Sequence, residues 1–496
     1  MNSIALPLLI PFAIAIVLLA VRSDKLSRII GPLGSLAMLA AAMYLTAELQ
    51  QGGIMSFNVG GWDAPYGIVL VIDYLSSLML LVSSLIAFVI ALYANRNLPA
   101  DLPVSRFYFF FFSLMMGVNG AFITGDVFNL YVWFEVMLIS SFVLITMGKK
   151  KEQLEGGIKY LALNIIGSML FLAGLGLLYG KTGTLNMAHL AEILKHDQQS
   201  VLMNPSSVLF FIAFGIKAAV FPLYFWLPSS YHTPDITISS LFAGLLTKVG
   251  VYTLIRFFTL FFVQDQAFWH PLLLIVAGLT MVAGGMAAAS YYETRRILSY
   301  HIISQIGYMI MGLGIFTPLA IAGAVFFTIH NMIAKTGTFL AAGLISKSKG
   351  TYELKEVGGL YSQNPLLAVL FIIPAFALAG FPPISGFFAK FMLLKAGIES
   401  GQYLITAIAL LTGFLTLYSM IKIWNEAFLK KQPENTAANA GVKLVFADYI
   451  PLAILATASL LLGIFASPVF DFVMQAGNQL FEPSDYINAV LSNQVP

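Results

Sequence analysis

The chain has 496 residues, of which 59% are hydrophobic and only 10% are charged, and its mean hydropathy is +0.87. A soluble domain carries roughly 25% charged residues, so a chain this poor in charge cannot cover its surface in water. These figures exclude a soluble enzyme, a disordered protein and a nucleic-acid-binding protein. The net charge of +3 says little by itself.

Long apolar segments follow one another along the whole chain. A bilayer core needs about 20 apolar residues per helix. We find fourteen segments of this kind, near 3–22, 27–49, 70–94, 105–124, 126–147, 154–180, 205–230, 234–262, 270–290, 296–316, 318–346, 363–400, 402–428 and 449–474. The runs are continuous rather than alternating, which argues against a β-barrel. No positively charged region precedes the first run, so it is not expected to be a cleavable signal peptide. We predict an all-α polytopic membrane protein.

Basic residues are concentrated in every second loop. The odd-numbered loops hold sixteen lysines and arginines, whereas the even-numbered loops hold only Lys181 and Lys195. An excess of Lys and Arg is typical of cytoplasmic loops. The pattern predicts cytoplasmic odd loops and, with fourteen spans, both termini outside.

Two spans contain internal prolines. The seventh carries Pro222 and Pro228, and the twelfth carries Pro382 and Pro383. Proline removes a helical hydrogen bond and clashes with the preceding turn, so both helices are expected to break near mid-membrane. Breaks five spans apart indicate two five-helix repeats, spans 4–8 and 9–13, of which the second is inverted. Transporters often place their ion path at such breaks, although prolines are also frequent in ordinary membrane helices.

These features divide the chain into four predicted parts. Residues 1–104 form three N-terminal helices, 105–262 the first repeat and 263–428 the inverted repeat. Residues 429–496 form a cytoplasmic loop, the last membrane helix and a short tail.

Five ionisable residues are predicted to lie deep in these spans: Glu135, Lys217, Lys248, Lys335 and Lys390. Each costs roughly 2.5–3.5 kcal/mol unless something compensates it. None has an opposite charge three or four residues away on its own helix, so compensation must cross between helices or come from water. Burial and mutual repulsion both disfavour four charged lysines, which predicts lysines that bind and release protons. The alternative is a set of static ion pairs, but one acid cannot pair four lysines.

Two histidines and one aspartate are further candidates for the proton path, with His330 predicted to belong to it and His232 and Asp73 as possible members. His330 lies in span 11 and His232 follows the break in span 7. A neutral imidazole can pass a proton between lysines that do not touch, although either histidine can also be a hydrogen-bonded packing residue. Asp73 lies near a span end, as do Asp126, Asp235 and Arg256, where capping or snorkelling is the simpler explanation.

Several site types are not expected from this sequence. Cysteine is absent, and the six histidines show no metal-ligand spacing, so no metal or cofactor is predicted. No nucleotide-binding motif is present, and we find no set of catalytic residues.

The segments NLYVWFEVMLISSF, FGIKAAVFPLYFWLP, TRRILSYHIISQIGYM and GFPPISGFFAKF resemble a known family. It comprises the proton-translocating membrane subunits shared by respiratory NADH–quinone oxidoreductases and Mrp-type multisubunit cation/proton antiporters. The resemblance runs through spans 3–13. A lysine rather than a glutamate at position 390, and a chain that ends soon after span 14, favour the antiporter branch.

The resemblance implies a role for each deep residue. Glu135 would pair with Lys217, and Lys248 would be the central lysine. His330 and Lys335 would continue the path in span 11, and Lys390 would be the outlet at the second break. In that family these residues form a hydrated polar axis along the membrane midplane.

The resemblance also implies a cellular setting. The chain would act with other subunits of a hetero-oligomeric Mrp complex in a bacterial cell membrane, exchanging external protons for cytoplasmic sodium. Because sodium needs oxygen ligands and negative charge, we expect it to cross a partner subunit rather than a row of lysines.

Three alternatives remain open. The first is a proton-pumping subunit of a respiratory NADH–quinone oxidoreductase or membrane-bound hydrogenase. The second is a polytopic membrane enzyme, for which the sequence offers no nucleophile–base set. The third is a passive scaffold whose lysines only organise helices.

Overall fold

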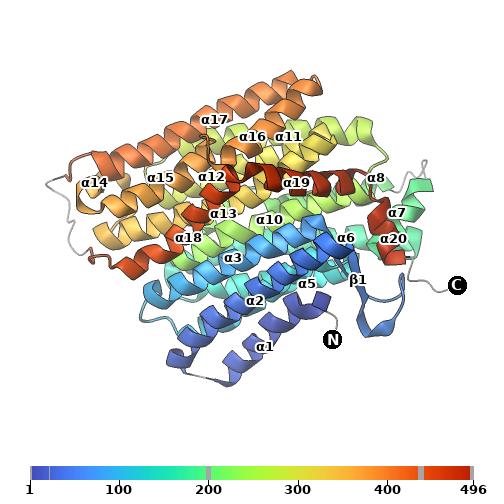
Figure 1. The fold of residues 1–496 in the computed structure, drawn as a ribbon, viewed down its shortest axis with the longest axis horizontal. Helices are drawn as coiled ribbons and strands as arrows, with labels where there is room; N and C mark the ends of the chain where they lie inside the picture. The colour runs from blue at the N-terminus through green and yellow to red at the C-terminus, as the bar shows by residue number, and fades with distance from the viewer. Residues whose placement is uncertain (1–2, 22, 197–202, 434–440, 492–496) are drawn as a thin grey trace.

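The computed structural model describes residues 3–21, 23–196, 203–433 and 441–491. Within these residues the chain is nearly all helical, and the long helices run side by side along the long axis of the molecule (Figure 1).

Three helices precede the first predicted repeat: α1 (Leu6–Ala20), α2 (Asp24–Gly52) and α3 (Tyr74–Asn97). The helices that follow up to residue 260 are α4 (Val104–Ile123), α5 (Val127–Thr146), α6 (Lys151–Thr182), α7 (Met187–His196), α8 (Met203–Ala218), α9 (Trp226–Ser230) and α10 (Ile236–Leu260). We call residues 104–260 the first unit.

The second unit comprises residues 266–424. Its helices are α11 (Gln266–Ser290), α12 (Thr294–Ile315), α13 (Pro318–Lys349), α14 (Leu360–Gln363), α15 (Pro365–Ala379), α16 (Ser385–Glu399) and α17 (Tyr403–Trp424). A short π-helical turn, Asn425–Leu429, extends α17, and the chain continues through α18 (Phe446–Ile464), α19 (Ala466–Phe481) and α20 (Ser484–Leu491).

Twelve helices of the described residues are long and apolar enough to cross a membrane. Two shorter apolar helices, Pro205–Ala218 and Pro365–Ala379, are the first halves of interrupted spans. The polytopic helical fold is therefore confirmed, while the total of fourteen spans stays a prediction.

Both predicted helix breaks are present. Helix α8 ends at Ala218 and is followed by turn residues that include Pro222, and α15 ends at Ala379 just before Pro382 and Pro383. Pro228 lies in the first turn of α9, where a proline prevents the helix from extending back toward α8. Backbone groups freed there find side-chain partners: Trp226 Nε1 donates to the Ile216 carbonyl at 2.8 Å, and the Phe221 amide donates to Thr280 Oγ1 at 3.0 Å. Such partners make irregular backbone tolerable inside a membrane protein.

The last predicted span is not one continuous helix. The expected segment 449–474 is interrupted at Phe465, between α18 and α19. Pro468 explains the interruption, because a proline clashes with the carbonyl four residues earlier, here that of Ile464. The prediction of one continuous helix over residues 449–474 was wrong because it did not take Pro468 into account.

A second difference lies at the start of the third span. Residues Val69–Ile72 form a strand, β2, rather than the first turn of a helix, and pair antiparallel with β1 (Met55–Asn58). Asp73 then caps α3, so the helix begins at Tyr74. β-branched Val69, Val71 and Ile72 favour an extended backbone there.

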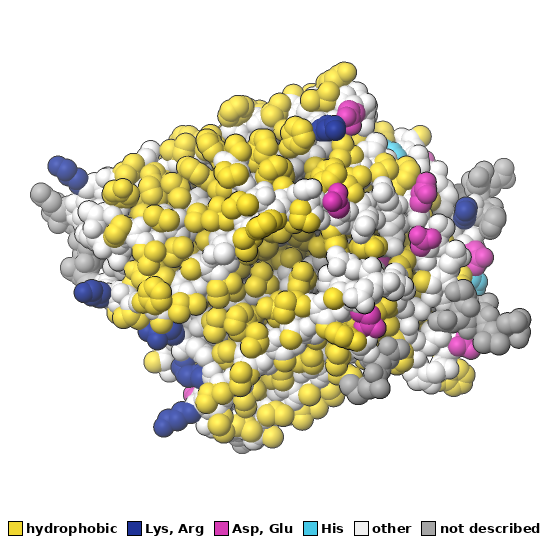
Figure 2. All heavy atoms as spheres, viewed as in Figure 1, with side chains coloured by type: hydrophobic (Ala, Val, Ile, Leu, Met, Phe, Trp, Pro, Cys, Tyr) yellow, Lys and Arg dark blue, Asp and Glu magenta, His cyan; other side chains and the backbone are white. Residues whose placement is uncertain are grey.

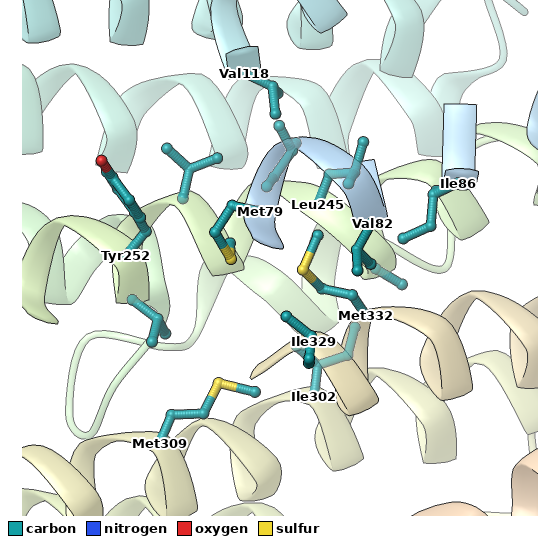
Figure 3. Close-up of a cluster of buried hydrophobic side chains, with 14 of the residues drawn as sticks. Met79, Val82, Ile86, Val118, Leu245, Tyr252, Ile302, Met309, Ile329 and Met332 are labelled. Carbon is teal, nitrogen blue, oxygen red and sulfur yellow. The ribbon is translucent and has the colours of Figure 1, made fainter. Parts of the chain in front are cut away.

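Helices α10, α12 and α13 form the centre of the bundle. Every residue of α10 is buried. Apolar side chains from α3, α4, α10, α12 and α13 meet around them, among them Met79, Val82, Val118, Leu245, Ile302, Met309, Ile329 and Met332 (Figure 3). Lys248 of α10 and Lys335 of α13, which are fully buried, therefore lie in an apolar, desolvated environment.

The face of the molecule drawn in Figure 2 is apolar between two polar ends. Figure 2 shows a broad field of hydrophobic side chains, with most lysines and arginines at the end near α14 and most acidic side chains at the end near α20. A belt of this kind matches a bilayer in which the two ends of the bundle face water.

Candidate functional site

The first part of the site is built by α5, α6 and α8. Lys217 lies in the last turn of α8, just before the break, and is buried. Its Nζ donates to Ser168 Oγ of α6 at 3.4 Å and lies 4.7 Å from the centre of the Phe134 ring. The Phe134 ring faces the ammonium, which partly offsets the loss of water.

Glu135 follows Phe134 on α5 and acts on Lys217 through its field rather than through a hydrogen bond. Its Oε1 is buried and has no hydrogen-bond partner among the described residues, while Lys217 uses its Nζ on Ser168. The Glu135 carboxylate is the acidic group whose charge reaches Lys217. The predicted Glu135–Lys217 pair therefore interacts through its charges but does not form a direct hydrogen bond.

A small cavity lies next to Lys217. It has a volume of about 20 Å³ and is lined by Phe134, Met137, Leu138, Tyr160, Asn164, Lys217, Trp226 and Leu246. This volume holds about one water molecule, and Lys217, Asn164 and Tyr160 supply polar groups for it. Because Leu246 belongs to α10, the cavity connects the end of α8 to the helix that carries Lys248.

The centre of the site is Lys248 on α10. Lys248 is fully buried, and its Nζ donates to the Ala243 carbonyl of its own helix at 2.5 Å. Gly250 allows α10 to approach the end of α8, because a Cβ at that position would meet the backbone of Ala218 and Lys217. The two lysine-bearing helix segments are therefore packed backbone to backbone.

Lys335 on α13 is the third of four buried lysines, Lys217, Lys248, Lys335 and Lys390, which we call the lysine row. It is fully buried, and its Nζ has no hydrogen-bond partner among the described residues. Its electrostatic neighbours are Lys248 of α10 and Lys390 of α16. Asn331, one turn earlier on α13, also has both side-chain polar atoms unpartnered within the described chain.

Lys390 on α16 lies at the second break. Its Nζ donates to the carbonyls of Leu378 and Ala379, at 3.0 and 2.8 Å, which are the last carbonyls of α15. Carbonyls at a helix C-terminus carry partial negative charge and stabilise a cation. A cavity of about 270 Å³ borders Lys390 and is lined on its outer side by Phe381, Phe391 and Phe414, which are exposed.

His330 lies within electrostatic reach of the last two lysines, Lys335 and Lys390. It is buried on α13, and the charges that act on it are those of Lys390 and Lys335. Its Nδ1 is hydrogen-bonded to Ser385 Oγ at 2.8 Å, and its Nε2 has no partner among the described residues.

His232 is not part of this row. Its Nδ1 donates to the Pro228 carbonyl at 2.6 Å, and the ring borders a polar cavity of about 370 Å³ lined by Glu152, Glu155 and Arg296, among others. Burial lowers the pKa of His232, and the nearby Arg296 and Arg295 lower it further.

Asp73 is also separate from the row. It accepts a hydrogen bond from the Ser76 amide at 2.8 Å, as a helix N-cap, and forms a 2.6 Å ion pair with Arg256 of α10. Both side chains are buried. The geometry is that of a cap and a fixed ion pair.

Two buried basic residues were not among the candidates predicted from the sequence. His301 on α12 is fully buried, neither ring nitrogen has a partner among the described residues, and it lies in the field of Lys335, Lys390 and Lys422. Lys422, near the end of α17, donates to the carbonyls of Ala289 and Tyr291 at 2.8 and 2.6 Å. Both could have been predicted, because each is a titratable residue inside a predicted span and is therefore a candidate for a functional site.

Among the described residues, no group of His, Asp and Glu side chains has the arrangement of a metal site. The site contains ammonium, imidazole, hydroxyl and amide groups and the single carboxylate of Glu135. Protons are the ions that such groups can bind and pass on.

Comparisons with known proteins identify the family of this chain. Residues 124–416 match the family described as NADH:quinone oxidoreductase/Mrp antiporter, transmembrane region. A relative from Alkalihalophilus pseudofirmus, named as one of the subunits of a Na⁺/H⁺ antiporter, is 45% identical over 491 residues, 99% of each chain.

Solved structures are similar over the same length. A chain of the Mrp complex from Dietzia sp. superposes with a TM-score of 0.93 at 30% identity, and 99% of each chain is covered. A chain of the membrane-bound sulfane sulfur reductase, an archaeal respiratory complex, gives a TM-score of 0.87 at 28% identity with the same coverage.

Proposed function

Because this chain belongs to the family of membrane subunits shared by NADH:quinone oxidoreductases and Mrp antiporters, we propose that it conducts protons within a multisubunit Na⁺/H⁺ antiporter complex. The protein is then a subunit of a secondary transporter rather than an enzyme. The observation that carries the proposal is Lys335, a fully buried lysine whose Nζ has no partner among the described residues and which lies within electrostatic reach of both Lys248 and Lys390.

The physical argument concerns the cost of buried charge. A permanent ammonium ion at such a site costs several kcal/mol of folding free energy. A lysine that releases its proton avoids that cost, and a neighbouring lysine can accept the proton in turn. Lys217, Lys248, Lys335 and Lys390 therefore act as successive proton-binding groups, with His330 between the last two.

Glu135 controls the first of these groups. A carboxylate that approaches Lys217 favours its protonated form, and a carboxylate that withdraws favours release. Since Glu135 and Lys217 are neighbours without a direct hydrogen bond, a small movement of either side chain changes the interaction. Lys390 releases the proton toward the far face.

The basic end of the bundle faces the cytoplasm in this proposal. The lysines and arginines gathered near α14 support this orientation through the positive-inside rule (Figure 2). Both termini then lie outside, and the protein resides in a bacterial cell membrane. Because the sequence contains no cysteine, the single-cysteine variants Lys355→Cys and Ser484→Cys can be tested for labelling by a membrane-impermeant maleimide in intact cells. Only the second should be labelled.

Sodium crosses a partner subunit in this proposal. The row contains four lysines and one carboxylate, and lysine side chains are not sodium ligands. The four-part division at residues 104, 262 and 428 belongs to the same proposal, with the two repeats conducting and the remaining segments supporting them.

The test uses the whole antiporter complex in everted membrane vesicles. Lys335→Ala should reduce Na⁺-dependent proton exchange to background while the complex assembles in normal amounts. Lys395→Ala is the matched control, because Lys395 is an exposed lysine of α16. Full exchange by the assembled Lys335→Ala complex would refute the proposal and favour a scaffold role.

The likeness to the archaeal respiratory complex supports a second candidate function, proton pumping driven by redox chemistry. The residues would do the same work under a different driving force. Purification of the native complex decides between the two, because flavin and iron–sulfur subunits accompany the chain only in the second case.

A further inference from the structure

A short hydrogen-bonded chain leads from His330 to the last membrane helix. Nδ1 of His330 lies 2.8 Å from Ser385 Oγ, and Ser385 Oγ lies 3.0 Å from Ser459 Oγ of α18. All three side chains are almost completely buried. Ser459 lies outside residues 124–416, the part that matches the family.

This chain crosses the point where two broken helices meet. Ser385 is the first residue of α16, directly after the second break, and Ser459 precedes the break at Phe465 by six residues. Gly463 permits the contact, because a Cβ there would collide with the Pro383 carbonyl. The last helix therefore packs directly against the irregular backbone of the second unit.

Only one of the two ring nitrogens of His330 has a hydrogen-bond partner among the described residues. Phe327 packs edge-on against it, with ring centres 5.8 Å apart, and Ser385 engages Nδ1. Nε2 has no partner among the described residues. The nitrogen that can exchange a proton with the lysine row is thus Nε2.

Two linked hydroxyls can satisfy Nδ1 in either protonation state. When the imidazole is protonated, Nδ1–H donates to Ser385, which donates to Ser459. When the neutral ring carries its proton on Nε2, Nδ1 accepts from Ser385, which accepts from Ser459. Hydroxyl hydrogens rotate freely enough for this reversal, so the ring need not move.

We propose that Ser385 and Ser459 are positioning residues for His330, which hold Nε2 available to the lysine row and stabilise the protonated ring. This proposal rests on the proposed function, because it requires His330 to carry protons. Its consequence is that the last helix, through Ser459, takes part in proton transfer. The competing explanation is that the serines only join α13, α16 and α18.

The first experiment compares serine variants in the intact complex. Ser385→Ala should slow antiport about tenfold and move its pH profile about one unit toward acid, because protonated His330 loses a charge-assisted hydrogen bond. Ser459→Ala should change both in the same direction but by less, because Ser385 keeps its contact with Nδ1 and loses only the acceptor for its own hydroxyl hydrogen. Ser459→Thr retains the hydroxyl and should restore both rate and profile. Ser419→Ala is the matched control, since Ser419 is a buried serine of α17 that donates to the Leu415 carbonyl of its own helix.

The other titratable groups near His330 are unchanged in these variants. Lys335 lies on its own helix, Lys390 on α16, and His301 and Tyr308 are the buried titratable groups of α12. Helix α15, described in full, has none, and in α18 the buried acid Asp448 lies at the opposite end from Ser459. A shift of the pH profile can therefore be assigned to the hydroxyls.

The second experiment needs no serine variant. Nitrogen-15 NMR of the histidine-labelled complex, assigned with His330→Gln, should show Nδ1 of His330 hydrogen-bonded in both its neutral and its protonated state. A free Nδ1 in either state would overturn the proposal.

The outcomes separate this inference from the function on which it rests. Wild-type rates and pH profiles in the two alanine variants, alongside an inactive Lys335→Ala complex, would overturn the inference alone. Equal losses of activity in Ser459→Ala and Ser459→Thr would also overturn it, because packing would then be the cause. Normal exchange by Lys335→Ala would overturn the proposed function itself.

Discussion

The two units of the molecule share a plan but differ in how they accommodate buried charge. In each unit the fourth membrane segment is broken, and a lysine lies at the break: Lys217 in the first unit and Lys390 in the second. The second helix of the first unit carries Glu135, whereas the second helix of the second unit carries His301. Among the described residues, only the first unit has a carboxylate deep inside its membrane helices, because Glu399 of the second lies exposed at a helix end.

From this difference we propose that the two units have separate tasks. In the first unit, a movable carboxylate can change the charge of a lysine. In the second unit, the Leu378 and Ala379 carbonyls hold Lys390. Backbone carbonyls cannot change their charge, so the second unit passes on a proton that the first unit has released. Lys248 and Lys335 lie on α10 and α13, which pack against each other across the two units.

The largest effect is expected from removing the carboxylate of the first unit. Glu135→Gln keeps the shape of the side chain but leaves Lys217 without an acidic neighbour, so antiport in everted vesicles should fall about a hundredfold. Glu155→Gln, an exposed acid of α6 paired with Lys159, is the control. An active Glu135→Gln complex would show that the units do not differ in this way.

A smaller loss is expected from the corresponding helix of the second unit. His301 lies in the field of Lys335, Lys390 and Lys422, and within the described chain it is bound to none of them. His301→Gln should lower the antiport rate about tenfold, because one of several proton-binding groups is lost. A loss as large as that of Glu135→Gln would mean that the second unit also holds a switching group.

The Asp73–Arg256 pair should affect stability rather than transport. Asp73→Asn keeps an N-cap residue but leaves the buried Arg256 without its counter-ion, which costs about 3 kcal/mol of unfolding free energy. Thermal unfolding of the purified complex should therefore begin at a lower temperature, with antiport per assembled complex unchanged. Lost antiport at unchanged stability would instead place Asp73 on the proton path.

The smallest effect concerns His232, outside both broken helices. Burial lowers its pKa in the folded protein below the usual value of about 6.5. Protonation therefore favours the unfolded state, so the contribution of His232 to stability is present above about pH 6.5 and is lost as the pH falls below it. His232→Gln should make stability slightly less sensitive to acid between about pH 7 and pH 5, measured by thermal unfolding at several pH values. A steeper loss in the variant would contradict this sign.

Several features of the site could be predicted from the sequence because each depends on a short segment. Pro222 and the Pro382–Pro383 pair predict the two breaks wherever their helices lie. Glu135, Lys217, Lys248, Lys335 and Lys390 stand out because an ionisable residue in an apolar run is costly in any membrane fold. Pro468 carried the same kind of information about the last helix.

Other features depend on which helices become neighbours. Asp73 and Arg256 are 183 residues apart in sequence, and only the packing of α3 against α10 turns two span-end charges into an ion pair. Ser385 and Ser459 look like ordinary helix serines until two breaks meet at His330.

The sequence by itself therefore determined the membrane class, most of the helical spans, the breaks at Pro222 and Pro382–Pro383 and the cost of the deep charges, since hydropathy and proline chemistry act within one segment. The tertiary structure decided which charges lie close enough to share a proton, which are fixed in an ion pair, and which polar groups remain unpartnered within the described chain. Those properties fall off within a few ångströms, so they exist only after the helices have packed.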